Sequence, residues 1–254
     1  MKILCAKFKS ILSITAMGLI AIFLVALVAI TNTGTVYFGY AYRKVPIYSV
    51  ETSEKKVALT FDAAWGADKT QKIVDTLKEA GVTGTFFLVG FWIEQNQDKV
   101  KYIDEAGFDI GTHSNTHPKM STLSSNQIRN ELSTSMDLIT KITGKHVKYF
   151  RPPFGDYNDI LLDVAGELGL KTIQWDVDTL DWKGLSGQEI VNRVMSNVKN
   201  GSIILCHNNS DHILDALPTL ILELKNQGYQ MVKISELVYE ENYHIDNNGL
   251  QRLK

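Results

Sequence analysis

Hydrophobic and polar positions alternate between two periodicities along residues 55–240, which predicts strands and helices in turn. Short apolar, β-rich runs occur at 57–61, 85–89, 108–110, 147–150, 172–175, 203–206 and 230–232. Apolar residues recur at helical spacing over roughly 68–80, 94–106, 158–168, 187–199 and 213–227, and a capping-box pair, Ser124 and Gln127, precedes another long helix. Repeated strand–helix units predict a parallel sheet covered by helices.

The number of these units favours a barrel over an open sheet. Seven or so units fit into residues 55–240, which is typical of an α/β protein with a distorted (β/α)7-8 barrel, either complete or incomplete. The first strand is not followed by G-x-G-x-x-G, and the chain contains no P-loop. A dinucleotide-binding sheet is therefore not expected.

The N-terminal segment follows a different pattern. Residues 11–30 form an uncharged apolar run of 20 residues, preceded by Lys2, Lys7 and Lys9. A helix of that length spans roughly 30 Å, the thickness of a bilayer core, and the lysines place its N-terminal side in the cytoplasm. We expect a single-pass signal anchor in the cell membrane, with the domain outside the cytoplasm; a cleaved secretion signal and a buried soluble helix are the alternatives.

The expected organisation follows from that segment. It comprises a cytoplasmic tail at 1–10, a transmembrane helix at 11–30, a stem at 31–54, the α/β domain at 55–240 and a C-terminal tail at 241–254. The net charge of −2 does not indicate a nucleic-acid partner, because phosphate binding requires a basic face. Two cysteines, Cys5 and Cys206, exclude a disulfide framework.

Ionisable residues follow the apolar runs at several predicted strand ends. They are Asp62, the loop that begins at His113, Arg151, Asp178 and His207. In α/β barrels the carboxyl ends of the strands meet at one face, where the active site lies. The sequence therefore predicts that these side chains form one site.

His113 and His117 are the strongest single feature of that set. Two imidazoles four residues apart can bind one divalent metal ion, and Pro118 favours a loop over a helix at this point. Two solvated surface histidines are the alternative for an isolated pair of this spacing. Their position at a strand end favours metal binding, with Zn²⁺ or Co²⁺ as the candidate cofactor.

The remaining ionisable residues suit acid–base chemistry. Asp62 either caps the next helix or acts as a general base toward a metal-bound water. Arg151 either forms a surface ion pair or holds a carboxylate through a bidentate contact. Asp178 and His207 can form a second pair, in which the carboxylate raises the imidazole pKa so that His207 serves as the acid; a buried structural histidine is the alternative.

Three aromatic residues lie beside these positions. Trp65, Phe154 and Trp182 can line a sugar site, because aromatic faces suit sugar rings, or they can be ordinary core or rim residues.

Five motifs in this order resemble the polysaccharide deacetylases, the NodB-homology or carbohydrate esterase family 4 enzymes. They are T-F-D at 60–62, H-S-x-x-H at 113–117, R-P-P-F at 151–154, D-x-x-D-W at 178–182 and I-x-L-x-H at 203–207. The resemblance covers about residues 55–240. It implies a distorted barrel and hydrolysis of an N-acetyl amide or an O-acetyl ester on a glycan.

The same resemblance implies a role for each motif residue. Asp62 corresponds to the base, His113 and His117 to metal ligands, and Arg151 to the group that orients the base. His207 corresponds to the acid tuned by Asp178, and the backbone N–H of Phe154 to an oxyanion donor. The apolar anchor and the T-F-D-A-A-W-G variant resemble the sporulation-associated PdaB-like branch, which implies peptidoglycan, or a chitin-like glycan, as the polysaccharide partner.

One position departs from the family pattern. The first motif usually reads T-F-D-D, whose second Asp completes a metal site of two histidines and one aspartate, but here that position is Ala63. Catalytic zinc sites use three protein ligands and a water. Asp62 could ligate directly, Asp68 could move in, the metal could be weakly held, or activity could be lost.

The sequence is therefore compatible with three functions. The first is N-acetyl hydrolysis on a cell-wall polysaccharide, for which the resemblance implies a role during sporulation. The second is a glycan-binding or spore-envelope scaffold that keeps the cleft without the chemistry, and the third is O-acetyl ester hydrolysis at the same site.

Overall fold

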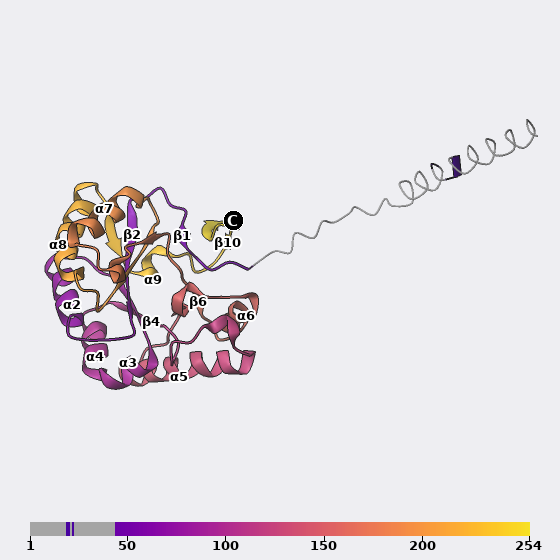
Figure 1. Cartoon of the computed structure of the whole chain (residues 1–254), viewed down its shortest axis with the longest axis horizontal. Coiled ribbons are helices and arrows are strands. Elements are labelled where there is room, and N and C mark those ends of the chain that lie inside the picture. Colours follow the sequence, from indigo (N-terminus) through magenta and orange to yellow (C-terminus); the bar gives the residue numbers. More distant parts are fainter. Residues whose placement is uncertain (1–18, 21, 23–43) are drawn as a thin grey trace, which may run out of the picture. The chain divides into compact units, whose positions relative to one another are not determined.

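A computed structural model describes residues 19, 20, 22 and 44–254 (Figure 1). The chain divides into two compact units, residues 1–42 and 43–254. The predicted membrane anchor at 11–30 lies outside the described residues, except for 19, 20 and 22, which are helical. Within the described part of the chain, no helix is both long enough and apolar enough to cross a bilayer.

The second unit is built from alternating strands and helices. The strands are β1 (Ser49–Val50), β2 (Lys56–Ala63), β3 (Thr85–Leu88), β4 (Asp109–Thr112), β5 (Tyr149–Phe150), β6 (Lys171–Thr172), β7 (Val177–Asp178), β8 (Ile203–His207), β9 (Gln230–Val232), β10 (Tyr243–Ile245) and β11 (Leu250–Leu253). The helices are α2 (Thr70–Glu79), α3 (Gly90–Gln95), α4 (Gln97–Glu105), α5 (Ser125–Thr143), α6 (Asp159–Glu167), α7 (Gly187–Asn197), α8 (Ile213–Asn226) and α9 (Ile234–Leu237). Three 3-10 turns are η1 (Met120–Thr122), η2 (Pro153–Gly155) and η3 (Asp181–Lys183).

Eight strands form one parallel sheet. Its order is β6-β5-β4-β3-β2-β8-β7, and β9 pairs with the first half of β2. Parallel strands joined by crossover helices must be covered on their faces, and strand β2 is accordingly buried along almost its whole length. The predicted parallel α/β architecture is confirmed, but β6 does not pair with β7, so the sheet is a curled half-barrel and not a closed barrel.

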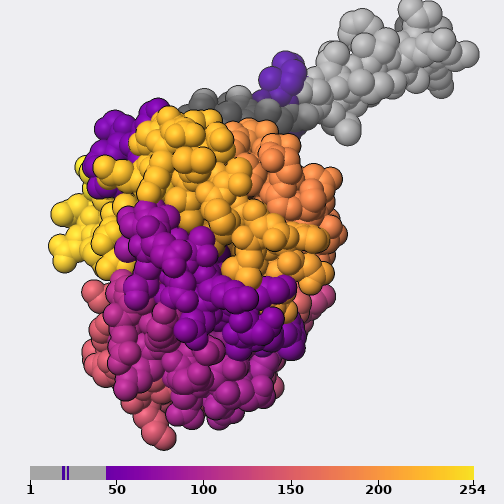
Figure 2. All heavy atoms as spheres, turned by 90° about the vertical axis from the view of Figure 1, so that its left-hand side faces the viewer, coloured from indigo at the N-terminus to yellow at the C-terminus, as the bar shows by residue number. Residues whose placement is uncertain are grey.

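The helices form a layer around the outside of this sheet. They pack in the order α7, α8, α2, α4, α5 and α6, which follows the order of the strands that they connect. In Figure 1 they lie around the periphery of the domain, and Figure 2 shows the face where the early, purple segments adjoin the late, orange and yellow ones. Alternate residues of β2 (Val57, Leu59, Phe61 and Ala63) belong to the core between sheet and helices.

The open side of the sheet is covered by the segment before β2. Ile47 makes a parallel bridge to Ile173, and Ser49 makes an antiparallel bridge to Ser202. Strand β1 also pairs with β11, which pairs with β10 in a second, three-stranded sheet. Residues 44–54, expected to belong to the stem, and residues 241–254, expected to be a tail, are therefore part of the folded unit, because backbone groups of the two segments pair with each other and with the main sheet.

Local signals predicted most elements correctly. The capping box that begins α5 is present, with the Ser124 backbone N–H donating to the Gln127 side-chain oxygen at 3.0 Å. Strand β7 was not expected, because two residues are too short to show a hydrophobic period. Its pairing with β8 is a tertiary interaction.

Candidate active site

The register of the central strands brings the first and last predicted site residues together. Asp62 on β2 is the direct neighbour of His207 on β8, and of Phe87 on β3. Both ionisable residues come at or near the carboxyl end of their strands. Asp62, His113, Asp178 and His207 line one cavity, and Arg151 binds Asp62. The five predicted strand-end residues therefore lie at one edge of the sheet, as expected.

Asp62 is held by a buried arginine. The Arg151 Nη1 donates to Asp62 Oδ1 at 2.8 Å, and Arg151 is fully buried. Burial by itself raises the pKa of Asp62, but the positive charge of Arg151, with smaller contributions from His113 and His207, outweighs burial and lowers it. The contact is a single hydrogen bond and not the bidentate one expected, because Arg151 Nη2 donates to the Gln174 backbone oxygen at 3.1 Å.

His113 has a defined tautomer. Its Nδ1 lies 2.7 Å from the Arg151 backbone oxygen, which can only accept, so Nδ1 carries the proton and Nε2 carries the lone pair. Nε2 lies 3.5 Å from Asp62 Oδ2. Burial lowers the pKa of His113, and burial followed by the charge of His113 lowers the pKa of His117 to about 4. Both imidazoles are therefore neutral at neutral pH, the state in which they bind metals.

The donor set does not complete a catalytic zinc site. The rings of His113 and His117 lie 5.0 Å apart, but no group of three or more His, Cys, Asp or Glu residues in the described chain is placed to hold a metal ion. Asp62 has one oxygen occupied by Arg151, and Asp68 is not among the residues that line the cavity. Ala63 contributes a buried methyl group where the resemblance requires a carboxylate.

The partner of His207 is Asp181 and not Asp178, which corrects the sequence-based pairing. Asp181 Oδ1 lies 2.7 Å from His207 Nδ1, and its Oδ2 accepts the His207 backbone N–H at 2.8 Å. Burial lowers the pKa of His207, but the hydrogen bond and charge of Asp181 outweigh burial and raise it. Of the three cavity imidazoles, His207 is therefore the one whose pKa is raised, so it keeps its proton to a higher pH than His113 and His117 do.

A turn explains why the nearer aspartate is not the partner. Leu180 has a left-handed backbone (φ 52°), and its N–H donates to Asp178 Oδ1 at 2.8 Å. This turn carries the chain from β7 into η3, so that Asp181 is almost fully buried against β8 while Asp178 stays on the cavity wall. Both aspartates belong to the D-x-x-D-W motif, and spacing alone does not distinguish them.

The site lies in a cavity of about 540 Å³. Its walls include the three aromatic residues predicted for a sugar site, and Trp65, Phe154 and Trp182 are each more than half exposed, so they are not core residues. The His117 ring packs edge-on against both Trp65 and Phe154, with centroids 4.9 and 4.6 Å away. A volume of this size, with aromatic walls and several polar groups that converge on it, is typical of a small-ligand site.

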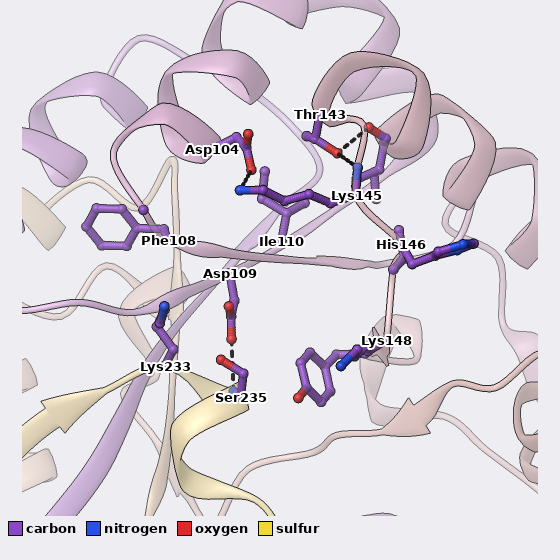
Figure 3. A pocket seen from close by; sticks show the side chains of 14 residues that line it. Asp104, Phe108, Asp109, Ile110, Thr143, Lys145, His146, Lys148, Lys233 and Ser235 are labelled. Atoms are coloured by element: carbon purple, nitrogen blue, oxygen red, sulfur yellow. Dashed lines mark hydrogen bonds and ion pairs between the residues drawn. The ribbon is translucent and has the colours of Figure 1, made fainter. Parts of the chain in front are cut away.

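A second cavity, of about 220 Å³, lies at the amino ends of β4 and β5 (Figure 3). Its acidic residues are engaged, because Asp104 binds Lys145 at 2.7 Å and Asp109 accepts the Ser235 backbone N–H at 2.9 Å. It contains none of the predicted site residues and lies at the edge of the sheet opposite to them.

Glu131 supports the site, although the sequence did not identify it. It lies on α5 and accepts the backbone N–H groups of Asn115 and Thr116 at 2.9 and 2.7 Å, which fixes the loop between the two histidines. In the sequence, Glu131 is simply an acidic residue on a predicted helix, and such a residue usually lies in solvent. Its role in fixing the histidine loop depends on tertiary contacts.

The site thus combines a carboxylate with a lowered pKa, Asp62, and a neighbouring imidazole with a raised pKa, His207. This arrangement is typical of hydrolases that use general acid–base catalysis. Comparison with known proteins agrees with that class. A family model described as "Polysaccharide deacetylase" matches residues 49–173. The chain belongs to the polysaccharide deacetylase family of hydrolases.

Three relatives illustrate the family. The uncharacterized protein YlxY of Bacillus subtilis is 34% identical, over 77% of this chain and 61% of its own. The peptidoglycan-N-acetylglucosamine deacetylase PgdA of Listeria monocytogenes is 35% identical, over 78% of this chain and 42% of its own. The peptidoglycan-N-acetylmuramic acid deacetylase PdaA of Bacillus subtilis is 34% identical, over 78% of this chain and 76% of its own. The chain thus spans less than two thirds of the first two relatives.

Among solved structures, BA3943 of Bacillus anthracis superposes with a TM-score of 0.75 and 39% identity, over 77% of this chain and 69% of its own. BA3943 is described as a CE4 family pseudoenzyme. A mutant of it with restored enzymatic activity superposes with a TM-score of 0.74.

Proposed function

We propose that this protein removes N-acetyl groups from a peptidoglycan-type polysaccharide. The observation that carries the proposal is the pairing of Asp62 with His207 on adjacent strands of one cavity, with the pKa of Asp62 lowered and that of His207 raised. Relatives over most of the domain deacetylate peptidoglycan, as their names state. The aromatic walls suit a sugar ring.

The proposed reaction uses residues of this chain in named roles. Asp62, oriented by Arg151, takes a proton from a water as its oxygen attacks the acetyl carbon. The oxyanion that forms is stabilised by the Phe154 backbone N–H. The C–N bond then breaks, His207 donates its proton to the leaving amine, and acetate is released; Asp181 stabilises the imidazolium until that transfer.

A bound divalent metal would polarise the acetyl carbonyl and the attacking water. His113 and His117 are the residues available to it, and they are too few for a catalytic zinc site. The proposed steps therefore do not depend on a metal.

One observation favours a second candidate. Ala63 leaves the family's metal site short of a ligand, and the similar structure BA3943 is described as a pseudoenzyme. The alternative is a protein that binds the glycan in the same cavity without hydrolysing it, for example as a spore-envelope scaffold. An O-acetyl ester hydrolase would differ from the main proposal only in its substrate.

We also propose the cellular setting expected from the sequence. The apolar run at 11–30 and the preceding lysines support a single-pass anchor in the cell membrane, with the domain on the outer side. The resemblance to the sporulation-associated branch supports a role during sporulation.

Acetate release by the purified full-length chain tests the main proposal. We expect release from N-acetylated chitooligosaccharide or peptidoglycan, and a loss on the order of 100-fold or more in Asp62→Asn, because the amide does not accept the proton of water. The Asp137→Asn variant, an exposed change on α5, is the matched control.

Three outcomes distinguish the candidates. Glycan binding without acetate release by the unaltered chain supports the binding protein. Release from O-acetylated glycan alone supports the esterase. Full activity in a folded Asp62→Asn variant contradicts the assigned base.

A further inference from the structure

Asp178 lines the cavity but takes no part in the proposed proton transfers. One of its oxygens accepts the Leu180 backbone N–H at 2.8 Å, and the side chain is only partly buried. Among the described residues, no Lys, Arg or His lies within ion-pair distance of its carboxylate, since its neighbour Arg193 instead donates from Nε to the Asp178 backbone oxygen at 2.6 Å.

The two cations of the site are already neutralised by other carboxylates. Arg151 pairs with Asp62 at 2.8 Å, and His207 pairs with Asp181 at 2.7 Å. Each of them therefore already has a carboxylate partner. Of the two carboxylates that line the cavity, Asp178 is the one without a cation partner.

Among the described residues, no Lys or Arg side chain lines the cavity. Apart from Asp62, Asp178 and His207, the lining consists of aromatic and aliphatic side chains, one amide and the imidazoles of His113 and His117. Three cations contact lining residues without being part of the lining. Arg193 donates to the Asp178 backbone oxygen, Lys69 donates to the Asn209 backbone oxygen at 3.3 Å, and Lys183 Nζ lies 4.9 Å from the Trp182 ring centroid.

We propose that Asp178 determines substrate specificity by making the cavity accept uncharged acetamido sugars and reject those that carry a carboxylate. In peptidoglycan this separates N-acetylglucosamine, with a hydroxyl at C3, from N-acetylmuramic acid, with a lactyl carboxylate there. The inference rests on the proposed function, and it decides between the two sugars that the relatives PgdA and PdaA act on. A carboxylate can accept hydrogen bonds from sugar hydroxyls, whereas it repels another carboxylate placed on the same cavity wall.

Equilibrium binding to the full-length chain tests this directly, without requiring turnover. Three ligands are compared: N,N′-diacetylchitobiose, the N-acetylglucosaminyl-N-acetylmuramic acid disaccharide, and the methyl ester of that disaccharide. Intrinsic fluorescence reports binding, because Trp65, Trp175 and Trp182 line the cavity. We expect the acid to bind about tenfold more weakly than its ester, since an uncompensated like charge is worth on the order of tenfold in Kd.

The Asp178→Asn variant isolates the charge. It keeps an acceptor oxygen for the Leu180 N–H and removes the negative charge, so the ratio of acid to ester Kd should fall to within about threefold of unity. Asp137→Asn, the same change at an exposed position, should keep the tenfold ratio. Equal binding of acid and ester by the unaltered chain, or an unchanged ratio in a folded Asp178→Asn, overturns the proposal.

Product analysis keeps this inference separate from the proposed function. Deacetylation of peptidoglycan followed by mass spectrometry should find glucosamine and not muramic acid without its acetyl group. No acetate release, with the binding preference intact, contradicts the hydrolase but not the selectivity of Asp178. Acetate release mainly from N-acetylmuramic acid contradicts the proposed role of Asp178 in selectivity but not the proposed hydrolase activity.

Discussion

Ala63 is the position at which the first motif departs from the T-F-D-D pattern of the family. It is fully buried at the end of β2, next to the base Asp62, and the two histidines lack a third ligand as a result. A methyl group neither binds a metal nor polarises a carbonyl. This position therefore offers a direct test of the proposed hydrolase against the alternative, a protein that binds the glycan without hydrolysing it.

Restoring a carboxylate at position 63 should strengthen metal binding. We expect Ala63→Asp to raise the affinity for Zn²⁺ or Co²⁺ on the order of 100-fold, because supporting residues outside the ligand shell alone are worth 10–100-fold. Titration calorimetry measures the affinity, and acetate release should rise with it.

The neighbouring substitution Ala64→Asp is the matched control, since Ala64 lines the cavity but follows the motif position. Equal gains in both variants would indicate nonspecific charge attraction. Unchanged affinity in a folded Ala63→Asp would contradict the incomplete-site interpretation.

Asp181 should control the pH dependence of the reaction. Because Asp181 raises the pKa of His207, the acid is protonated below that pKa, and activity is lost as pH rises through it. Replacing Asp181 with Asn removes the charge, so the basic limb of the kcat/KM profile should move to lower pH, and the rate at pH 7 should fall about 100-fold.

Asp178→Asn serves as the comparison, because the charge of Asp178 contributes less to the pKa of His207 than that of Asp181. Its basic limb should move less. A larger shift of the basic limb in Asp178→Asn than in Asp181→Asn would support the Asp178–His207 pairing expected from the sequence.

Most site residues could be predicted because each follows a buried strand. Asp62, His113, Arg151 and His207 were all expected at one edge of the sheet, and the register places them there. Asp181 could not be chosen over Asp178, because the choice depends on a left-handed turn at Leu180, a residue type without a preference for that conformation.

At the scale of elements, strand β1 is the component that the sequence placed in the stem and that the structure places in the domain. Its contact with the main sheet passes through Gly201, whose backbone oxygen accepts the Val50 N–H at 3.0 Å. Gly201 has a φ of 78°, and an added Cβ would lie 1.7 Å from the Val50 oxygen. Glycine is therefore required both by conformation and by the close approach of β1.

Gly201→Ala should destabilise the domain more than an ordinary glycine substitution. The control Gly107→Ala has a similar φ of 85° with no atom within 4 Å, so it should cost only the strain, about 1–2 kcal/mol. Gly201→Ala should cost about 2 kcal/mol more, because the methyl group displaces β1. Urea unfolding measures both, and equal losses would show that β1 contributes little to stability.

Elements with a clear hydrophobic period were predictable, and short ones were not. Helix α5 has both a capping box and an apolar face, and it begins where the sequence indicated. Strands β7, β10 and β11 contain two to four residues each, and pairing with distant segments defines them. The C-terminal residues were therefore interpreted as a tail.

At the scale of the whole molecule, the second compact unit contains the complete cavity and both sheets. Removing residues 1–42 should therefore leave the free energy of unfolding of the domain unchanged within about 0.5 kcal/mol, as expected for independent regions. The truncated protein should move from the membrane fraction to the soluble fraction of expressing cells. A soluble full-length chain would contradict the proposed anchor, and an unfolded truncation would contradict the independence of the unit.

The sequence by itself determined the parallel α/β class, the alternation of the main strands and helices, the deacetylase family, and the placement of Asp62, His113, Arg151 and His207 in one site. These features depend on local periodicity and on residues placed directly after strands. Only the tertiary structure decided that the sheet remains open, that β1 and the C-terminal strands complete the domain, and that Asp181 instead of Asp178 pairs with His207. Each of these depends on contacts between segments far apart in the chain or on a turn that local preference does not specify.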